Sequence, residues 1–104
     1  MGLVEELSPS LTGKQRRHLR ALAHEMKPLV LVGQRGVTES LITNLHEQLL
    51  AHELVKVKVH DPSSMEEVAR ELGTATGAQL VQWIGKSLVY YRAHPEEPTI
   101  ALPR

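Results

Sequence analysis

A short glycine loop, Gly33-Gln34-Arg35-Gly36, contains the residues of this chain that are best suited to binding chemistry. It follows the apolar run Leu29–Val32 and precedes a segment of helical periodicity that begins near Thr38. Two glycines let backbone amides approach a phosphodiester closely, an arginine can pair with a phosphate, and a helix N-terminus favours anions. Ordinary strand-to-helix turns also contain glycine. The surrounding residues must therefore distinguish an anion-binding loop from a plain turn.

Basic residues are concentrated around this loop although the chain as a whole is neutral. The full chain has 12 basic and 12 acidic residues, whereas residues 11–36 contain six basic residues and a single acidic one, Glu25. Charges separated by more than a Debye length, about 8 Å at physiological salt, act almost independently. We therefore expect a locally basic surface, formed by Lys14, Arg16, Arg17, Arg20, Lys27 and Arg35.

A helix is predicted before the apolar run. Thr12 and Gln15 have the spacing of a capping box, in which two side chains satisfy the first free amides of a helix. Pro28 disfavours helical backbone in the residue before it, so the helix is expected to span about Thr12 to Met26. Apolar residues at helical spacing define its buried side, namely Leu19, Leu22, Ala23 and Met26.

The basic residues of this helix share one flank beside the apolar stripe, apart from Lys14. A charged flank is often only solvent-exposed surface. Here every formal charge has the same sign, which favours a binding surface. The flank consists of Arg16, Arg17, Arg20, His24 and Lys27.

Two strands are predicted next to these basic residues. The run Leu29–Val32 is too short for a helix after a proline and is typical of a strand buried on both faces. The segment Leu54–His60 alternates with a period of two, which places its valines toward the core and Lys56 and Lys58 on the opposite face. Those lysines either extend the binding surface or protect a sheet edge from aggregation.

The remaining elements complete one domain, which a chain of 104 residues can fill. We expect residues 1–10 to be flexible and residues 11–104 to form the domain. A second helix spans about Thr38 to Ala51, and a third begins at Ser64, which has capping-box spacing to Glu67, and ends near Gly77. The exposed face of the third helix is mostly acidic. Strands at about 79–84 and 87–92 flank a tight turn, and an irregular tail follows.

Motifs for catalysis and metal binding are absent from the sequence. There is no cysteine, which excludes disulfides, thiolate metal sites and a cysteine nucleophile. His18 and His24 are six positions apart, as are His46 and His52, so neither pair has the spacing of a helical zinc site. Gly85-Lys86-Ser87 matches the end of a phosphate-binding P-loop, but Leu80 occupies the position of the required upstream glycine. We expect a non-catalytic protein without cofactor or metal.

The sequence also indicates where the protein works. No basic region followed by a long apolar stretch is present at the N-terminus, and no apolar run is long enough to span a bilayer. We therefore expect a cytoplasmic protein with no membrane partner. A monomer is favoured, although the sequence leaves the oligomeric state open.

Two stretches together resemble a known family. Residues 21–59 read ALAHEMKPLVLVGQRGVTESLITNLHEQLLAHELVKVKV, and residues 84–92 read IGKSLVYYR. This pattern resembles the CRM (chloroplast RNA splicing and ribosome maturation) domain, and in particular its stand-alone bacterial form, the YhbY-like proteins. The resemblance implies an α/β domain of order α-β-α-β-α-β-β with a four-stranded mixed sheet, similar to the C-terminal domain of translation initiation factor three.

The resemblance also implies a function. Bacterial members of the family are linked to precursors of the large ribosomal subunit, plant relatives to intron splicing, and the Gly-x-x-Gly loop with nearby basic residues to RNA contact. We therefore expect an RNA-binding protein acting on ribosomal RNA or the large-subunit precursor. The alternative is a protein-interaction adaptor whose basic face binds an acidic protein partner. The candidate RNA-binding residues are Gly33, Gln34, Arg35, Gly36, Arg16, Arg17, Arg20, Lys27, Lys56 and Lys58.

Overall fold

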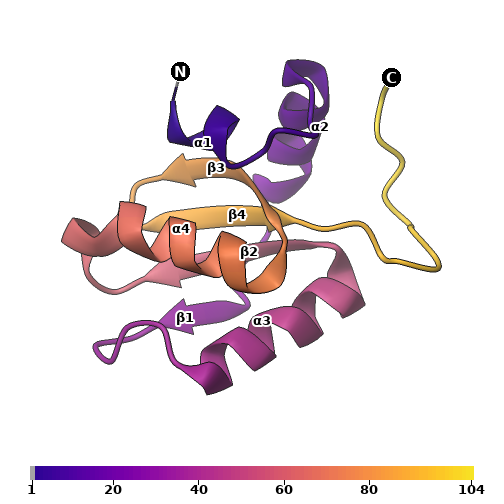
Figure 1. The fold of residues 1–104 in the computed structure, drawn as a ribbon. Helices are drawn as coiled ribbons and strands as arrows, with labels where there is room; N and C mark the ends of the chain where they lie inside the picture. Colours follow the sequence, from indigo (N-terminus) through magenta and orange to yellow (C-terminus); the bar gives the residue numbers. More distant parts are fainter. Residues whose placement is uncertain (1) are drawn as a thin grey trace.

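The computed structural model describes residues 2–104 and contains one four-stranded sheet with helices on both faces (Figure 1). The strand order is β1 (Val30–Val32), β2 (Leu54–Val59), β4 (Ser87–Tyr91) and β3 (Gln79–Ile84). β1 runs parallel to β2, whereas β4 is antiparallel to both β2 and β3. This mixed sheet confirms the predicted fold class and the order of its main elements.

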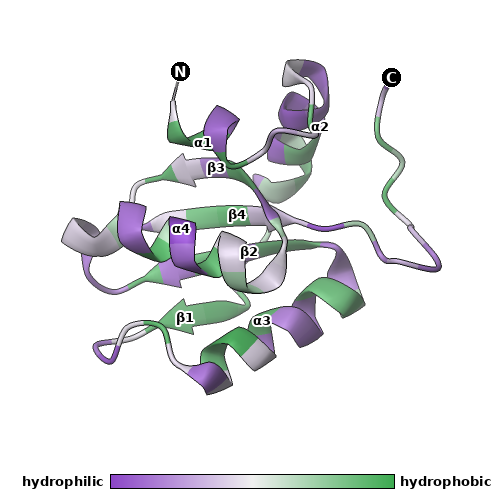
Figure 2. Ribbon diagram, in the orientation of Figure 1, coloured by the Kyte–Doolittle hydropathy of each residue, from purple (hydrophilic) through white to green (hydrophobic). Residues whose placement is uncertain are grey.

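One face of the sheet is covered by α3 (Glu39–His52) and α4 (Met65–Thr76). Val55, Val57 and Val59 of β2 point to this side, as their period-two spacing predicts, and pack in the main core with Leu45 and Leu49 of α3. In Figure 2 the strands are largely hydrophobic, whereas the outer surface of α4 carries hydrophilic residues. No helix within residues 2–104 has the length and apolar character needed to cross a membrane.

The other face of the sheet is partly covered by α2 (Gly13–Ala23). The predicted capping box is confirmed, because the Gln15 N–H donates to Thr12 Oγ1 (3.1 Å) and the Thr12 N–H donates to Gln15 Oε1 (3.0 Å). The helix ends at Ala23, earlier than the predicted Met26. The Met26 N–H instead donates to the Ala23 carbonyl (3.0 Å), a tighter turn that redirects the chain toward β1. Lys27 therefore lies in a link and not on the helix flank.

Residues 2–10 differ from the expected flexible segment in that they contain α1 (Leu3–Glu6) and pack on the sheet. Leu3, Val4 and Leu7 contact the main core, and the Leu80 N–H of β3 donates to the Leu7 carbonyl (3.1 Å). Arg70 of α4 forms an ion pair with Glu6. Met1 lies outside the described residues.

The start of α4 also differs from its prediction. Ser64 makes no capping hydrogen bond, so the predicted capping box does not form. A short 3-10 turn, η1 (Pro62–Ser64), precedes the helix, and Asp61 accepts from the Ser63 N–H (3.0 Å). The helix ends at Thr76, near Gly77 as predicted, and Gly77 caps it with a φ of 73° that favours glycine.

A buried carboxylate holds the C-terminal tail. Glu53, between α3 and β2, is 2% exposed and accepts hydrogen bonds from the backbone N–H groups of His94 (2.7 Å), Thr99 (2.8 Å) and Ile100 (2.8 Å) and from the Thr99 hydroxyl (2.6 Å). Burial alone would raise its pKa, but these donors outweigh burial and hold the pKa at about 2. Ile100 and Leu102 consequently pack against the core beneath α2.

Candidate nucleic-acid interface

One end of the α2 face of the sheet is not covered by α2. The helix packs over Leu54, Val81, Val89 and Tyr91, all of which are buried. At the other end, four side chains form one row across all four strands, because each pairs in register with the next. Leu31 is 63% exposed, Ile84 is 58% exposed, and Lys58 is exposed. We call this row, made of Leu31, Lys58, Ser87 and Ile84, the open row.

The open row corrects one prediction. Leu29–Val32 was expected to be buried on both faces, and this is wrong, because β1 lies at the edge of the sheet. Val30 and Val32 are buried against α3, but Leu29 and Leu31 are exposed on the side that α2 leaves free. A side chain on an edge strand remains exposed where no helix crosses it.

The position of β2 decides between the two interpretations of its lysines. β2 lies between β1 and β4, so Lys56 and Lys58 do not protect a sheet edge. Both lysines lie on the α2 face, because the neighbouring valines face the main core. Lys58 belongs to the open row, and Lys56 pairs with Val89 in the next row, closer to α2. The lysines are thus available for a ligand on this face.

The basic residues of the first helix are only partly brought together. Arg20 is half-buried and lines the same cavity as Val81 and Gln82 of β3. Lys27 is exposed and precedes Leu29, whose N–H donates to the Lys56 carbonyl (3.0 Å). Both residues therefore border the same face as the lysines of β2.

The other two arginines of this helix, Arg16 and Arg17, do not line the cavity beside β3. Arg16 donates to the Leu11 carbonyl (2.8 Å) and to Ser8 Oγ (3.2 Å), so its guanidinium holds the segment before α2. Arg17 is exposed, and no hydrogen bond of its guanidinium is found within residues 2–104. Arg20 is the α2 arginine that lines the cavity beside β3.

The glycine loop lies at the same end of the sheet as the open row. The Gly36 N–H donates to the Gly33 carbonyl (3.0 Å), which closes a turn with Gln34 and Arg35 exposed at its tip. The His60 N–H donates to the Val32 carbonyl (2.8 Å), and the Val59 N–H donates to the Lys86 carbonyl (2.8 Å). These bonds join the ends of β1 and β2 and the β3–β4 turn in one rim.

The two sides of the loop have different charge. A hollow of about 250 Å³ on one side is lined by Asp61, Glu67 and Glu71, which disfavour an anion. A hollow of about 630 Å³ on the other side is lined by the loop, Leu31, Thr38 and Ser40 and by no acidic residue. Thr38 caps α3 by accepting from the Leu41 N–H (3.2 Å), so the positive end of that helix dipole lies here. An anion would therefore approach the loop from the side of Leu31.

The glycines of the loop differ in what the fold requires of them. Gly36 has a φ of 71°, a conformation that side chains other than glycine adopt at a cost. Gly33 does not have a positive φ, and a Cβ atom built on it would meet no atom within 4 Å. Nothing in the fold itself therefore requires glycine at position 33, and the space beside it is free for a ligand.

Some residues of this surface were not singled out by the sequence. Leu31 and Ile84 read as ordinary strand residues, because their exposure depends on the strand order and on where α2 crosses. From the sequence, Lys86 was only a turn residue. The hydrogen bond from the Val59 N–H of β2 to the Lys86 carbonyl places it on the rim. No group of three His, Asp or Glu side chains suited to a metal ion occurs within residues 2–104.

Comparison with known proteins relates this geometry to a family. Residues 11–92 match the CRS1 / YhbY (CRM) domain. The Bacillus subtilis protein named "Probable RNA-binding protein YqeI" is 41% identical, over 89% of this chain and 99% of that protein. A Haemophilus influenzae protein named "RNA-binding protein" is 39% identical, over 91% of this chain and 97% of that protein.

A solved structure agrees with these matches. The solution structure of SAV1595 from Staphylococcus aureus, described as a candidate RNA-binding protein, superposes with a TM-score of 0.77. It is 41% identical and covers 89% of this chain and 99% of that chain.

Proposed function

The chain belongs to the CRS1 / YhbY (CRM) domain family, and from this premise we propose that it is a non-catalytic RNA-binding protein. One observation carries the proposal: Lys56, Lys58 and the open row lie on one face of the sheet and lead to the glycine loop at its end. The acidic helix α4 packs on the opposite face. A polyanion therefore has one favourable face on which to bind.

The parts of this face have separate roles in the proposed complex. Lys58 and Arg35 pair with phosphates, and the free space beside Gly33 lets the RNA backbone approach the loop amides. Leu31 and Ile84 offer apolar surface to unpaired bases, which a duplex would not present. Single-stranded or loop RNA therefore fits the face better than a regular duplex.

We further propose that the RNA is ribosomal, that the protein acts in assembly of the large ribosomal subunit in the cytoplasm, and that it does so as a monomer. One support is the family resemblance. The other is the neutral net charge of the chain, because only the locally basic face then attracts RNA, and binding is limited to RNA that fits the shape of this face. Crosslinking in cells followed by sequencing of the attached RNA tests this proposal. The expected result is enrichment at a defined site in the large-subunit RNA precursor.

The same cells provide the discriminating control. RNase treatment of a native pull-down should release the ribosomal partners if RNA mediates the contact. Partners that stay bound after RNase, without enrichment of ribosomal RNA, would contradict the proposal and favour a protein adaptor.

Alanine substitutions of the two loop glycines should separate folding from binding. Gly36→Ala should lower the free energy of unfolding by about 1–2 kcal/mol, because alanine is disfavoured at a φ of 71°. Gly33→Ala should leave stability within about 0.5 kcal/mol of the parent, because its Cβ meets open space. RNA affinity should nevertheless fall in Gly33→Ala. Urea denaturation measures stability, and filter binding measures RNA affinity. Unchanged affinity of Gly33→Ala would show that the RNA backbone does not approach the loop closely at this glycine.

A further inference from the structure

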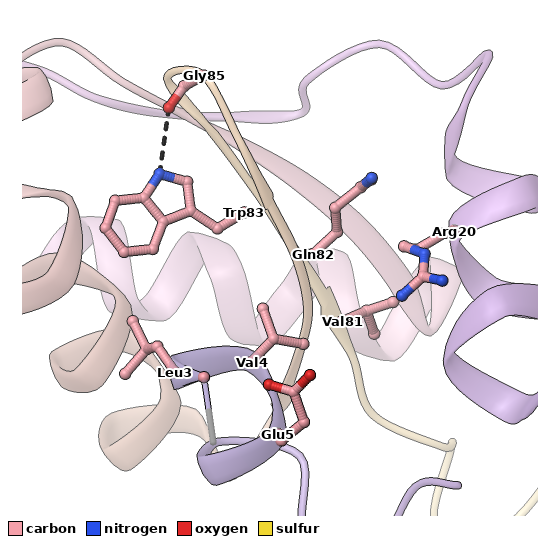
Figure 3. A pocket seen from close by; sticks show the side chains of 9 residues that line it. Leu3, Val4, Glu5, Arg20, Val81, Gln82, Trp83 and Gly85 are labelled. Atoms are coloured by element: carbon pink, nitrogen blue, oxygen red, sulfur yellow. Dashed lines mark hydrogen bonds between the residues drawn. The ribbon is translucent and has the colours of Figure 1, made fainter. Parts of the chain in front are cut away.

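A groove at the free edge of β3 lies beyond the surface described above (Figure 3). It has a volume of about 580 Å³, within the usual range of small-ligand clefts, about 300–1,000 Å³. One wall is formed by Leu3, Val4 and Glu5 of α1, and β3 contributes Val81, Gln82 and Trp83. Arg20 of α2 closes the side toward the proposed RNA face.

Trp83 is the unusual residue of this groove. It is the only tryptophan of the chain and is 40% exposed, whereas Tyr90 and Tyr91 are buried. Its Nε1–H donates to the Gly85 carbonyl (3.2 Å), which satisfies the polar atom and orients the ring. Figure 3 shows the indole beside the turn, with Leu3 and Val4 below it. What remains accessible is aromatic surface in a fixed orientation, and such surface is suited to stacking.

The groove lies at the same end of the sheet as the glycine loop. The carbonyl of Lys86, next to Gly85, is bonded to the end of β2, and the end of β2 is bonded to the end of β1. Three strand spacings separate β1 from β3, roughly 14 Å at about 4.8 Å each. A few extended nucleotides can cover that distance.

The open row leads to Trp83 along the chain itself. Ile84 forms the β3 end of the row, and Trp83 is the preceding residue of the same strand. Trp83 pairs with Leu88, a main-core residue, so its ring lies on the opposite face from Ile84. RNA that crosses the open row thus reaches the β3 edge, and a base turned around that edge meets the indole.

The groove contains the groups that a nucleotide needs. Arg20 can pair with a phosphate on the side of the RNA face, and the partly buried Leu3 and Val4 provide apolar contacts. The Glu5 carboxylate can bond the polar edge of a base. A carboxylate only accepts hydrogen bonds, so it favours a base edge with adjacent N–H donors, as guanine has, and repels a bare phosphate.

We propose that this groove binds one unpaired base of the RNA, stacked on Trp83 with its phosphate at Arg20, and that guanine is preferred because of Glu5. The proposal rests on the RNA-binding function proposed above. The free edge of β3 would also suit an extended peptide. Backbone pairing with a peptide, however, needs neither the charge of Arg20 nor the exposed indole surface of Trp83.

The experiment uses the full chain and a single-stranded RNA of about ten nucleotides, within the site sizes of single-strand-binding modules. Anisotropy of a fluorescein-labelled RNA reports binding, and fluorescence of the unique Trp83 reports stacking with the unlabelled RNA. The RNA contains one guanine among uracils, and a matched RNA carries an abasic site in place of the guanine. Inorganic polyphosphate serves as a polyanion without bases.

The guanine RNA should quench Trp83 fluorescence, and the abasic RNA and polyphosphate should bind with little quenching. Trp83→Leu should weaken binding of the guanine RNA about tenfold, within the effect of losing one stacked base, and should not change polyphosphate binding. Trp83→Phe, which keeps an aromatic ring, should retain most of the affinity and controls for an effect of Trp83→Leu on folding.

The outcomes separate this proposal from the one on which it rests. RNA binding with unchanged Trp83 fluorescence and parental affinity of Trp83→Leu would overturn the base site, leave the RNA-binding function intact, and point to a protein partner for the groove. Absence of any RNA binding by anisotropy would overturn both. If RNAs with guanine, adenine or uracil at the test position bound with equal affinity and still quenched Trp83, only the guanine preference assigned to Glu5 would be overturned, and the base site would stand.

Discussion

Glu53→Gln is expected to lower the free energy of unfolding by about 3 kcal/mol at pH 7, or roughly 12–20 °C in melting temperature. The carboxylate is buried and accepts hydrogen bonds from three backbone N–H groups and one hydroxyl. A glutamine amide has one acceptor oxygen, and its NH₂ group would face at least the His94 N–H, which is then left unpaired. Thermal denaturation measures the loss. The surface variant Glu96→Gln is the matched control and should melt like the parent.

The pH dependence of stability should identify the same residue. The pKa of Glu53 falls from an ordinary value of 4.5 to about 2 in the folded state. Its contribution is therefore complete above pH 4.5 and is lost as the pH falls toward 2. Glu53→Gln should have a flatter stability profile across this window than the parent. Identical slopes for the two proteins would show that the carboxylate does not hold the tail in the way described.

Charge reversal at the centre of the proposed interface is expected to have the largest effect on binding. Arg35→Glu and Lys58→Glu should each weaken RNA affinity tenfold or more, since a hydrogen bond to a charged group contributes about 1.5–3 kcal/mol. Neither side chain is buried, so stability should change by less than about 0.5 kcal/mol. Filter binding measures the affinities. Lys14→Glu changes the net charge equally but lies outside the basic flank, so it should bind almost like the parent.

The salt dependence of binding distinguishes phosphate contacts from a general charge effect. If about four to six phosphates are neutralised, log affinity should fall against log salt with a slope of roughly −3 to −5. Each of the two reversals should reduce the magnitude of this slope by about 1, and Lys14→Glu should not. A salt-independent affinity, or equal loss in all three variants, would contradict a defined phosphate-binding face.

Much of the fold could be predicted because it depends on short-range interactions. The capping box of Thr12 and Gln15, the alternation of β2 and the turn at Gly85 each involve residues that are close in the sequence. Predictions failed where a second local structure competes with the predicted one. At α4, Ser64 has the right spacing to cap the helix, but the 3-10 turn after Asp61 occupies the backbone that a capping box needs.

The candidate site was predictable to a smaller extent. The loop and the lysines of β2 could be selected from residue type and spacing. The sequence could not tell that Arg16 binds the segment before α2 or that Arg92 donates to the Thr76 carbonyl (2.7 Å), so that both guanidiniums are used inside the fold. Basic residues that look equivalent in a sequence differ in the structure, because backbone carbonyls from other segments compete for them.

The sequence by itself determined the main helices and strands, the basic character of the region around the loop, and the family to which the chain is similar. Only the tertiary structure decided which side chains are accessible. The order β1-β2-β4-β3 puts β1 and β3 at the edges, and Trp83 is exposed at the free edge of β3. On the other face α2 covers one end of the sheet only, which exposes Leu31 and Ile84. Exposure depends on what packs against a strand from elsewhere in the chain, and local periodicity carries no information about that neighbour.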